Sequence, residues 1–284
     1  MKNFGIYFNP LYLEKQEVFD LLKNLNEKKD LIFYKFEEQK KILPEFIQYY
    51  DDSSDGKLDC ILVFGGDGTI LRAIDFSLKF GAPLLGINLG KLGFLSESSL
   101  RELEKSIDEL KKNKFKILAR MLLKVVLKRN KKVLYSDLAL NDAVIYKGQN
   151  PRLIDISFSS NRRFVVETRC DGIVVSTPTG STAYSLSAGG PILSPVMEAI
   201  VVAPLNPHIL SIRPMVFSSK DIITLKVKDI YNESFLQLDG LNKYRVLKDD
   251  EIIVTQASQK VDFIKLSNKT FYQILRKKLH MGKR

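Results

Sequence analysis

The chain has 284 residues, of which 45% are apolar, and a formal net charge of +11. No apolar run approaches the roughly 20 residues that cross a bilayer, and residues 1–14 lack the long apolar centre of a signal peptide, so we expect neither a membrane span nor a secretory leader. Cys60 and Cys170 are the only cysteines, which favours a cytoplasmic protein with reduced thiols and no zinc site.

The first hundred residues alternate between strand and helix patterns. Strands are predicted at Phe4–Phe8, Leu31–Phe36, Cys60–Phe64 and Pro83–Asn88. The residues Val18, Leu21, Leu22 and Leu25 follow the spacing of a buried helix face, and further helices are predicted from near Gly68 and over Leu100–Leu110. Because strands that alternate with helices form parallel sheets covered on both faces, we predict an α/β domain over residues 1–114.

The pattern changes to a period of two after about residue 115. Extended segments are predicted at Lys116–Arg129, Val133–Tyr146, Arg152–Ser159, Arg163–Arg169 and Asp221–Lys228. Apolar residues alternate with polar ones in two of these segments, which indicates antiparallel sheet with one solvated face. We therefore predict a second, all-β domain over residues 115–264.

The C-terminal segment 265–284 is basic and has helical spacing, and we predict that it packs back on the first domain. It has no acidic residue and contains Lys265, Lys269, Arg276, Lys277, Lys278, Lys283 and Arg284. Such a charge raises the question of nucleic-acid binding. Since no recognition motif accompanies it, we interpret the charge as a solvated helix end and tail, and expect no nucleic-acid partner.

Residues 65–69 read Gly-Gly-Asp-Gly-Thr and join a predicted strand to a predicted helix. Glycine lets a ligand approach the main chain closely, and a helix start presents unpaired N–H groups, so the turn favours phosphate. The Asp67 carboxylate repels phosphate unless a metal or a proton intervenes. Asp67 therefore either holds Mg²⁺, or accepts a proton from an attacking hydroxyl, or only caps the helix.

Two further segments carry polar groups next to apolar runs. Within residues 171–191, a dense set of hydroxyls follows the predicted strand Ile173–Val175. These hydroxyls can stabilise a turn, or they can satisfy the polar edges of a base and a ribose. In the second segment, Asn141 and Asp142 interrupt a strand-like run. A buried polar pair needs partners, and vicinal ribose hydroxyls would provide them, although a turn or an edge position explains the pair equally well.

Several segments together resemble the NAD kinases. The sequence GGDGT at 65–69 is similar to the motif that NAD kinases share with lipid kinases and phosphofructokinases. The segment STPTGSTAYSLSAGGPI from residue 176 is more specific to the NAD kinases. Further similar segments are LND at 140–142, GINLGKLGFLSE at 86–97 and NPHILSIRP at 206–214.

This resemblance implies a fold, a reaction and partners. The fold is an N-terminal Rossmann-like α/β domain and a C-terminal antiparallel β-sandwich, with the site between them. The reaction is Mg²⁺-dependent transfer of the γ-phosphoryl group of ATP to the 2′-hydroxyl of the adenosine ribose of NAD, which yields NADP. The resemblance also implies a homodimer or homotetramer.

The resemblance further implies roles for residues at matching positions. Asp67 is expected to accept the proton of the 2′-hydroxyl, and Asp171 is expected near the nicotinamide. The residues expected to bind NAD are Asp67, Gly68, Asn141, Asp142, Arg152, Arg169, Asp171, Thr182, Ala183, Tyr184, Ser185, Leu186 and Ser187. The residues expected to face the ATP phosphates are Gly65, Gly66, Gly68, Thr69 and Arg72.

One departure and two competing functions remain. Leu241 stands after Asp239-Gly240 where many family members have glutamine, so a side-chain contact by that glutamine is in doubt. A lipid kinase would share GGDGT but has no use for the hydroxyl-rich segment. A non-enzymatic dinucleotide or nucleic-acid binder would fit the basic C-terminus but has no use for Asp67.

Overall fold

The computed structural model describes residues 1–9, 11–12, 15–50, 56–90, 93–149, 152–229, 233–280 and 282. Lys91, Leu92, Lys283 and Arg284, which belong to the segments singled out above, lie outside the described residues. The chain forms two compact units, Met1–Ala119 with Val261–Arg284, and Arg120–Lys260. The division falls inside the long strands β7 (Lys116–Arg129) and β18 (Glu251–Lys265), whereas the sequence places it at 114/115 and 264/265.

Unit 1, Met1–Ala119 with Val261–Arg284, contains a parallel sheet. Its strands are β1 (Asn3–Phe8), β2 (Ile32–Lys35), β3 (Gln48–Tyr49), β4 (Cys60–Phe64), β5 (Leu84–Asn88) and β6 (Ser96–Ser99). They lie in the order β3-β2-β1-β4-β5, and β6 pairs with β5. These pairs are parallel, and β18 adds a further parallel contact to β5 at Phe263 and Leu84.

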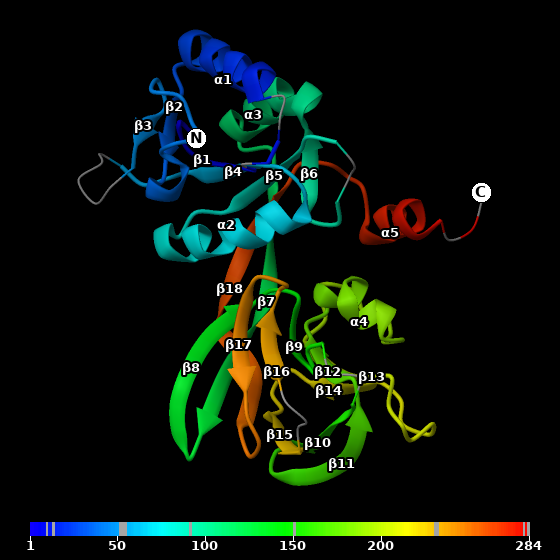
Figure 1. Ribbon diagram of the computed structural model, residues 1–284. Helices are drawn as coiled ribbons and strands as arrows, with labels where there is room; N and C mark the ends of the chain where they lie inside the picture. Colours follow the sequence, from blue (N-terminus) through cyan, green and yellow to red (C-terminus); the bar gives the residue numbers. More distant parts are fainter. Residues whose placement is uncertain are drawn as a thin grey trace. The chain divides into compact units, whose positions relative to one another are not determined.

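Helices cover both faces of this sheet (Figure 1). They are α1 (Lys15–Lys29), α2 (Asp67–Phe80) and α3 (Leu103–Lys111), with single 3₁₀ turns at Glu37–Gln39 and Leu100–Glu102. A further helix, α5 (Phe271–Leu279), lies to one side of the sheet (Figure 1) and adds no residue to its core cluster. Apolar side chains of α1 and α3 share one core cluster with the sheet. On α2, Phe76 stacks on Phe36 with ring centroids 4.5 Å apart and packs against Tyr7 of β1. All five residues of β4 are buried, as expected for a central parallel strand.

The C-terminal segment is held to unit 1 by polar contacts. Glu97 of β6 pairs with Lys265 at 2.8 Å and accepts the N–H groups of Leu266 and Ser267. The helix α5 then begins with a capping box formed by Thr270 and Gln273.

Unit 2, Arg120–Lys260, contains two antiparallel sheets. Besides β7 and β18, its strands are β8 (Lys132–Ala139), β9 (Asp142–Tyr146), β10 (Ile154–Ser160), β11 (Arg163–Cys170), β12 (Gly172–Ser176), β13 (Ala199–Leu205), β14 (Met215–Ser218), β15 (Ile223–Asp229), β16 (Ser234–Leu238) and β17 (Asn242–Val246). A 3₁₀ turn at Gly180–Thr182 and the short helix α4 (Tyr184–Ser187) follow β12. One sheet has the order β11-β10-β15-β18-β7-β8, and the other has the order β14-β13-β12-β9-β16-β17.

The two sheets of unit 2 pack face to face as a β-sandwich. A single core cluster combines Ile156 and Leu225 of the first sheet with Ile173 and Leu236 of the second. The rings of Phe158 and Phe217 meet edge-on across the sandwich, with centroids 5.3 Å apart. The α/β and β-sandwich fold classes expected from the sequence are therefore confirmed.

One predicted extended run is interrupted at the Asn141-Asp142 pair. The run Val133–Tyr146 is not continuous, because β8 ends at Ala139 and β9 begins at Asp142 in the other sheet. The chain changes sheets at Leu140 and Asn141, the first two residues of the LND motif.

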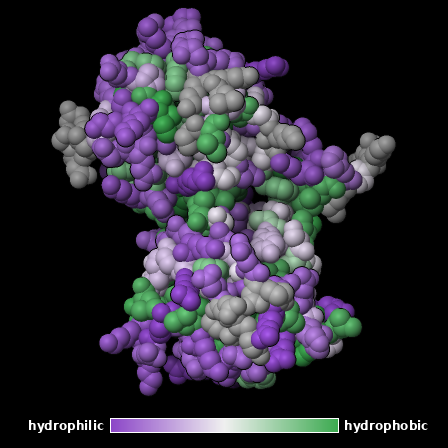
Figure 2. All heavy atoms as spheres, viewed as in Figure 1, coloured by the Kyte–Doolittle hydropathy of each residue, from purple (hydrophilic) through white to green (hydrophobic). Residues whose placement is uncertain are grey.

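The surface is mainly hydrophilic on the face that Figure 2 shows, with exposed apolar side chains in small groups. Within the described part of the chain, the helices are too short or too polar to span a membrane.

Candidate active site

The glycine turn of unit 1 lies at the carboxyl end of β4. Gly66 is the N-cap of α2, and Asp67 is the first residue of the helix. A methyl group at Gly65 would lie 2.4 Å from the Thr69 hydroxyl, so Thr69 packs where only glycine fits. A methyl group at Gly66 or Gly68 would have no described atom within 4 Å. The main chain beside Asp67 is therefore open to a ligand.

The Asp67 carboxylate is fixed by a loop distant in sequence. Its Oδ2 accepts the N–H of Phe94 at 2.8 Å, and its Oδ1 accepts the N–H of Leu95 at 3.1 Å. Gly93 lies so close that a methyl group there would be 1.9 Å from Oδ1. The helix cap is Gly66, with no side-chain cap hydrogen bond. These contacts favour a carboxylate oriented for another purpose over one that only caps its own helix.

Arg72 lies one turn further along α2 and is exposed. Its charge acts on the Tyr7 hydroxyl: burial and then Glu38 raise the pKa of Tyr7, and Arg72 opposes them.

The LND motif of unit 2 is a tightly held turn between β8 and β9. Thr177 binds its carbonyl groups, because the Thr177 hydroxyl donates to Leu140 O at 2.5 Å and the Thr177 N–H donates to Asn141 O at 2.9 Å. Gly180 packs against the same main chain, so that a methyl group there would lie 2.0 Å from Asn141 O.

The N–H groups of the same turn converge on one carboxylate. Asp239 accepts the N–H groups of Leu140, Asn141 and Asp142 at 2.7, 2.7 and 3.0 Å. Burial and then the charge of Asp239 raise the pKa of Asp142 to about 7. Burial also raises the pKa of Asp239, but its three N–H donors favour the charged form, so we assign the proton to Asp142.

Many hydroxyls of the segment 171–191 serve the loop itself. Besides Thr177, the Ser181 hydroxyl accepts the N–H of Leu193 at 2.9 Å and donates to Pro178 O at 2.7 Å. The Thr182 hydroxyl donates to Thr179 O. Ser185 is fully buried. The structural use of these hydroxyls, which the sequence left open, is thus seen at several positions.

Two adjoining pockets open on unit 2 and share Tyr146 and Tyr184. The first, which we call the Asp142 pocket, has a volume of about 500 Å³, and is lined by Asn141, Asp142, Val144, Tyr146, Ala183, Tyr184, Gln237, Asp239 and Gly240. The second, the Asp171 pocket, has a volume of about 460 Å³. Both are large enough for parts of a nucleotide.

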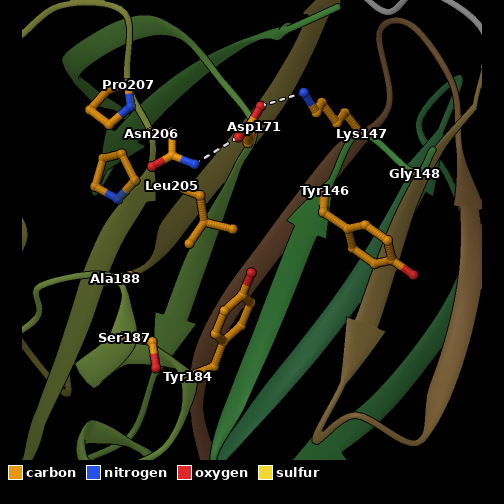
Figure 3. Close-up of a pocket in the computed structure, with 11 residues that line it drawn as sticks. Tyr146, Lys147, Gly148, Asp171, Tyr184, Ser187, Ala188, Leu205, Asn206 and Pro207 are labelled. Atoms are coloured by element: carbon orange, nitrogen blue, oxygen red, sulfur yellow. Dashed lines mark hydrogen bonds and ion pairs between the residues drawn. The ribbon is translucent and has the colours of Figure 1, made fainter. Parts of the chain in front are cut away.

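The Asp171 pocket contains a polar cluster (Figure 3). Asp171 pairs with Lys147 at 2.6 Å and accepts the side-chain amide of Asn206 at 2.8 Å. Burial opposes ionisation, but the bonds from Asn206 and Lys147 outweigh it and lower the pKa of Asp171. In Figure 3 the Tyr184 ring projects from the start of α4 into this pocket, and Ser187 lies beside it.

Comparison with known proteins identifies the family. The ATP-NAD kinase N-terminal domain matches residues 22–115, and the ATP-NAD kinase C-terminal domain matches residues 140–266. An NAD kinase of Desulforamulus reducens is 40% identical over 221 residues, which cover 78% of this chain and 77% of the relative. This chain belongs to the ATP-NAD kinase family.

Two solved structures of NAD and NADH kinases have a similar fold. A yeast NADH kinase complexed with NADH has a TM-score of 0.88 and 26% identity, covering all of this chain and 89% of the yeast chain. An NAD kinase from Archaeoglobus fulgidus in complex with ATP has a TM-score of 0.73 and 23% identity, with full coverage of both chains. The second likeness supports the fold alone.

Only some of the residues expected from the resemblance to the NAD kinases line the two pockets of unit 2. Asn141, Asp142, Ala183 and Tyr184 line the Asp142 pocket, and Asp171, Tyr184 and Ser187 line the Asp171 pocket. Of the remaining expected residues of unit 2, Arg152, Arg169, Thr182, Ser185 and Leu186 line neither of these two pockets. Arg169 instead pairs with Asp155 of the adjacent strand at 2.9 Å.

Sequence reasoning missed other polar residues of the site. Lys147, Asn206, Gln237 and Asp239 line the two pockets, and none was assigned a role. The Asp239-Gly240 pair enters the sequence analysis only as the context of Leu241, which closes the turn between β16 and β17 and is 37% exposed. Asn206 opens the segment NPHILSIRP, which resembles the NAD kinases, whereas nothing local in the sequence marks Lys147 or Gln237.

Proposed function

We propose that this protein is an NAD kinase that transfers the γ-phosphoryl group of ATP to the 2′-hydroxyl of the adenosine ribose of NAD. The observation that carries the proposal is the Asp67 carboxylate, held by the N–H groups of Phe94 and Leu95 beside the open main chain of Gly66 and Gly68. Membership of the ATP-NAD kinase family links this arrangement to phosphoryl transfer from ATP. The yeast relative is complexed with NADH, which supports a dinucleotide as the acceptor here.

The glycine turn is assigned to the phosphate donor. The first N–H groups of α2 have no partner within the helix, and the positive end of the helix dipole attracts phosphate. Mg²⁺ arrives with ATP as part of the nucleotide substrate, where it neutralises charge on the phosphates. Among the described residues, no three His, Cys, Asp or Glu side chains form a metal-binding group. A single carboxylate, Asp67, fits Mg²⁺, because this ion is usually held by one or two carboxylates and substrate phosphates.

The pockets of unit 2 are assigned to the dinucleotide. The Asp142 pocket offers an amide and a carboxyl group to the ribose hydroxyls and the adenine, and Tyr184 offers an aromatic face. The Asp171 pocket, with its Lys147 and Asn206 cluster, is assigned to the nicotinamide end.

Phosphoryl transfer depends mainly on positioning and charge neutralisation. The 2′-hydroxyl must come within hydrogen-bond reach of Asp67, which then orients the hydroxyl and accepts its proton. Both Asp67 oxygens are already held by N–H groups, so the carboxylate has a fixed orientation before the substrate binds.

The test is NADP formation from ATP, Mg²⁺ and NAD by the purified protein. Asp67→Asn is expected to reduce kcat by at least about 100-fold with NAD binding preserved, since the amide cannot accept the proton. Asp75→Asn, an exposed position on the same helix, is the control and should retain full activity. Near-normal turnover by Asp67→Asn would remove Asp67 from the mechanism.

The same assay separates the alternatives. Phosphorylation of diacylglycerol or a sphingoid base without NADP formation would support a lipid kinase. Salt-sensitive DNA binding without turnover would support a nucleic-acid binder. NADH, and inorganic polyphosphate as a donor, should be tried in parallel.

We also infer a cytoplasmic homodimer or homotetramer, on the basis of the family resemblance. Light scattering of the purified protein at several concentrations measures the subunit number, and a monomer at all of them would contradict this inference.

A further inference from the structure

Asp239 lies in the tight turn that joins β16 to β17. Asp239 and Gly240 both have positive φ, at +50° and +71°, and the N–H of Leu241 donates to Leu238 O at 2.8 Å. Two central residues with positive φ are typical of a type I′ hairpin turn, for which Asp-Gly and Asn-Gly are both preferred. The turn therefore requires a small polar residue at 239 but does not require a carboxylate.

The carboxylate instead serves a segment about a hundred residues earlier in the chain. Three consecutive N–H groups, those of Leu140, Asn141 and Asp142, donate to it. The N–H of Asp239 in turn donates to Asp142 O at 3.0 Å. Three consecutive amides can share one acceptor because the chain is changing sheets here and leaves the strand ladder.

The opposite side of the same segment is held by Thr177, which binds the carbonyl groups of Leu140 and Asn141. The main chain at 140–142 is therefore fixed on both sides, by Asp239 at its N–H groups and by Thr177 at its carbonyl groups. Asn141 and Asp142 line the Asp142 pocket, so the position of this main chain determines where both side chains enter the pocket.

We propose that Asp239 is a positioning residue for the dinucleotide, which acts by fixing the main chain from which Asn141 and Asp142 enter the Asp142 pocket. The proposal rests on the assignment of this pocket to the dinucleotide. Preorganisation of this kind strengthens binding, because the ordering of the site is completed before the ligand arrives.

The charge of Asp239 has a second effect in the same place. It lies close enough to Asp142 to disfavour a second negative charge, and burial acts in the same direction. The raised pKa of Asp142 favours its protonated form, which presents an O–H donor as well as an acceptor to the ligand, whereas an ionised carboxylate only accepts.

The informative variant is Asp239→Asn. Asparagine keeps the hairpin turn, since Asn-Gly suits a type I′ turn, and its Oδ1 still accepts N–H groups. Its Nδ2 is a donor and opposes one of the three N–H groups. We expect the KM for NAD to rise about tenfold, with kcat and the KM for ATP within twofold of the wild type. Asp239→Ala removes every acceptor and should raise the KM for NAD further.

Asp250→Asn is the matched control. Asp250 is a fully buried carboxylate of unit 2 that, like Asp239, accepts a main-chain N–H. Its donor is Leu247 at 2.8 Å, and it also pairs with Arg129. It lines neither pocket. We expect Asp250→Asn to lower the melting temperature without changing the KM for NAD.

NAD binding is measured by calorimetric titration beside the kinetics, so that the kinase assignment and the positioning role of Asp239 can be refuted independently. Wild-type protein that binds NAD without forming NADP would refute the kinase assignment, whereas weaker NAD binding by Asp239→Asn would still support positioning. An unchanged KM and NAD affinity in Asp239→Asn would overturn the inference. Equal losses in kcat and both KM values, with a melting temperature lowered as in Asp250→Asn, would also overturn it, because they indicate a purely structural role.

Discussion

Substitution of Gly93 by alanine should displace the Asp67 carboxylate and so impair its function, although Asp67 itself is not mutated. A methyl group at Gly93 would lie 1.9 Å from Asp67 Oδ1 and 2.6 Å from its carboxyl carbon, whereas ordinary contact begins at 3.4 Å. The φ angle of Gly93 is not in the positive range, so alanine adds no backbone strain there. The methyl group must therefore displace the carboxylate by about 1.5 Å, a shift that follows from these two distances.

The size of the effect follows from the bonds that this movement breaks. Asp67 loses its bonds from Phe94 and Leu95, and hydrogen bonds to charged groups contribute about 1.5–3 kcal/mol each in buried sites. Asp67 is partly exposed, so water replaces much of this loss, and we expect unfolding free energy to fall by only about 1–2 kcal/mol. Misplacement of a reacting group by about 1 Å costs roughly 100-fold in rate, and we expect kcat to fall by at least that factor.

The assay is NADP formation, with kcat and both KM values measured beside thermal unfolding. Gly90→Ala is the matched control: it lies in the same segment, and its added methyl group would have no described atom within 4 Å. We expect wild-type kinetics from it. If Gly93→Ala kept normal turnover, either Asp67 would not act in the reaction or its orientation would not matter.

Three further predictions concern stability and pH. Gly180→Ala would place a methyl group 2.0 Å from the main-chain oxygen of Asn141, so thermal unfolding should show a loss of about 1–3 kcal/mol and kinetics a raised KM for NAD. Glu97→Gln breaks a largely buried ion pair with Lys265, and urea denaturation should show a loss of about 3 kcal/mol; an unchanged midpoint would contradict this. The pKa of Asp142 is raised to about 7 by burial and then by nearby charge, so this group binds more protons in the folded state and makes the wild type less stable as pH rises from about 4 to 7. The variant Asp142→Asn should therefore gain stability relative to the wild type over that range in urea titrations.

Much of the fold could be predicted from local patterns. The strand Cys60–Phe64 and the extended segment Lys116–Arg129 have the predicted bounds, because their residue patterns are set by burial along the segment itself. The run Val133–Tyr146 is extended as predicted, but it is divided between strands of two sheets. The polar pair Asn141 and Asp142 marks the break in the sequence, but the contacts from Asp239 and Thr177 that hold the turn come from distant positions and have no local signal.

The motifs of the candidate site could be predicted from the sequence, but the hydrogen bonds that hold them in place could not. The turn Gly65–Thr69 joins a strand to a helix as expected, since glycine chemistry is local. The partners of Asp67 are main-chain N–H groups of two apolar residues, Phe94 and Leu95, and their side chains give no sign of this contact. Conversely, hydroxyls such as those of Thr177 and Ser181 suggest ligand contacts in the sequence, although they hold the loop together.

Residual acceptor capacity explains how two carboxylates that both accept main-chain N–H groups can have different roles. An ionised carboxylate offers about four lone-pair sites. Asp67 accepts two main-chain N–H groups and lies beside open glycines, so about two sites remain for a substrate hydroxyl or a metal ion. Asp239 accepts three N–H groups, which leaves about one site. Asp67 is thus fixed in place and still able to react. In Asp239, most of the hydrogen-bond acceptor sites are occupied by main-chain N–H groups, so this residue acts through the segment that it holds.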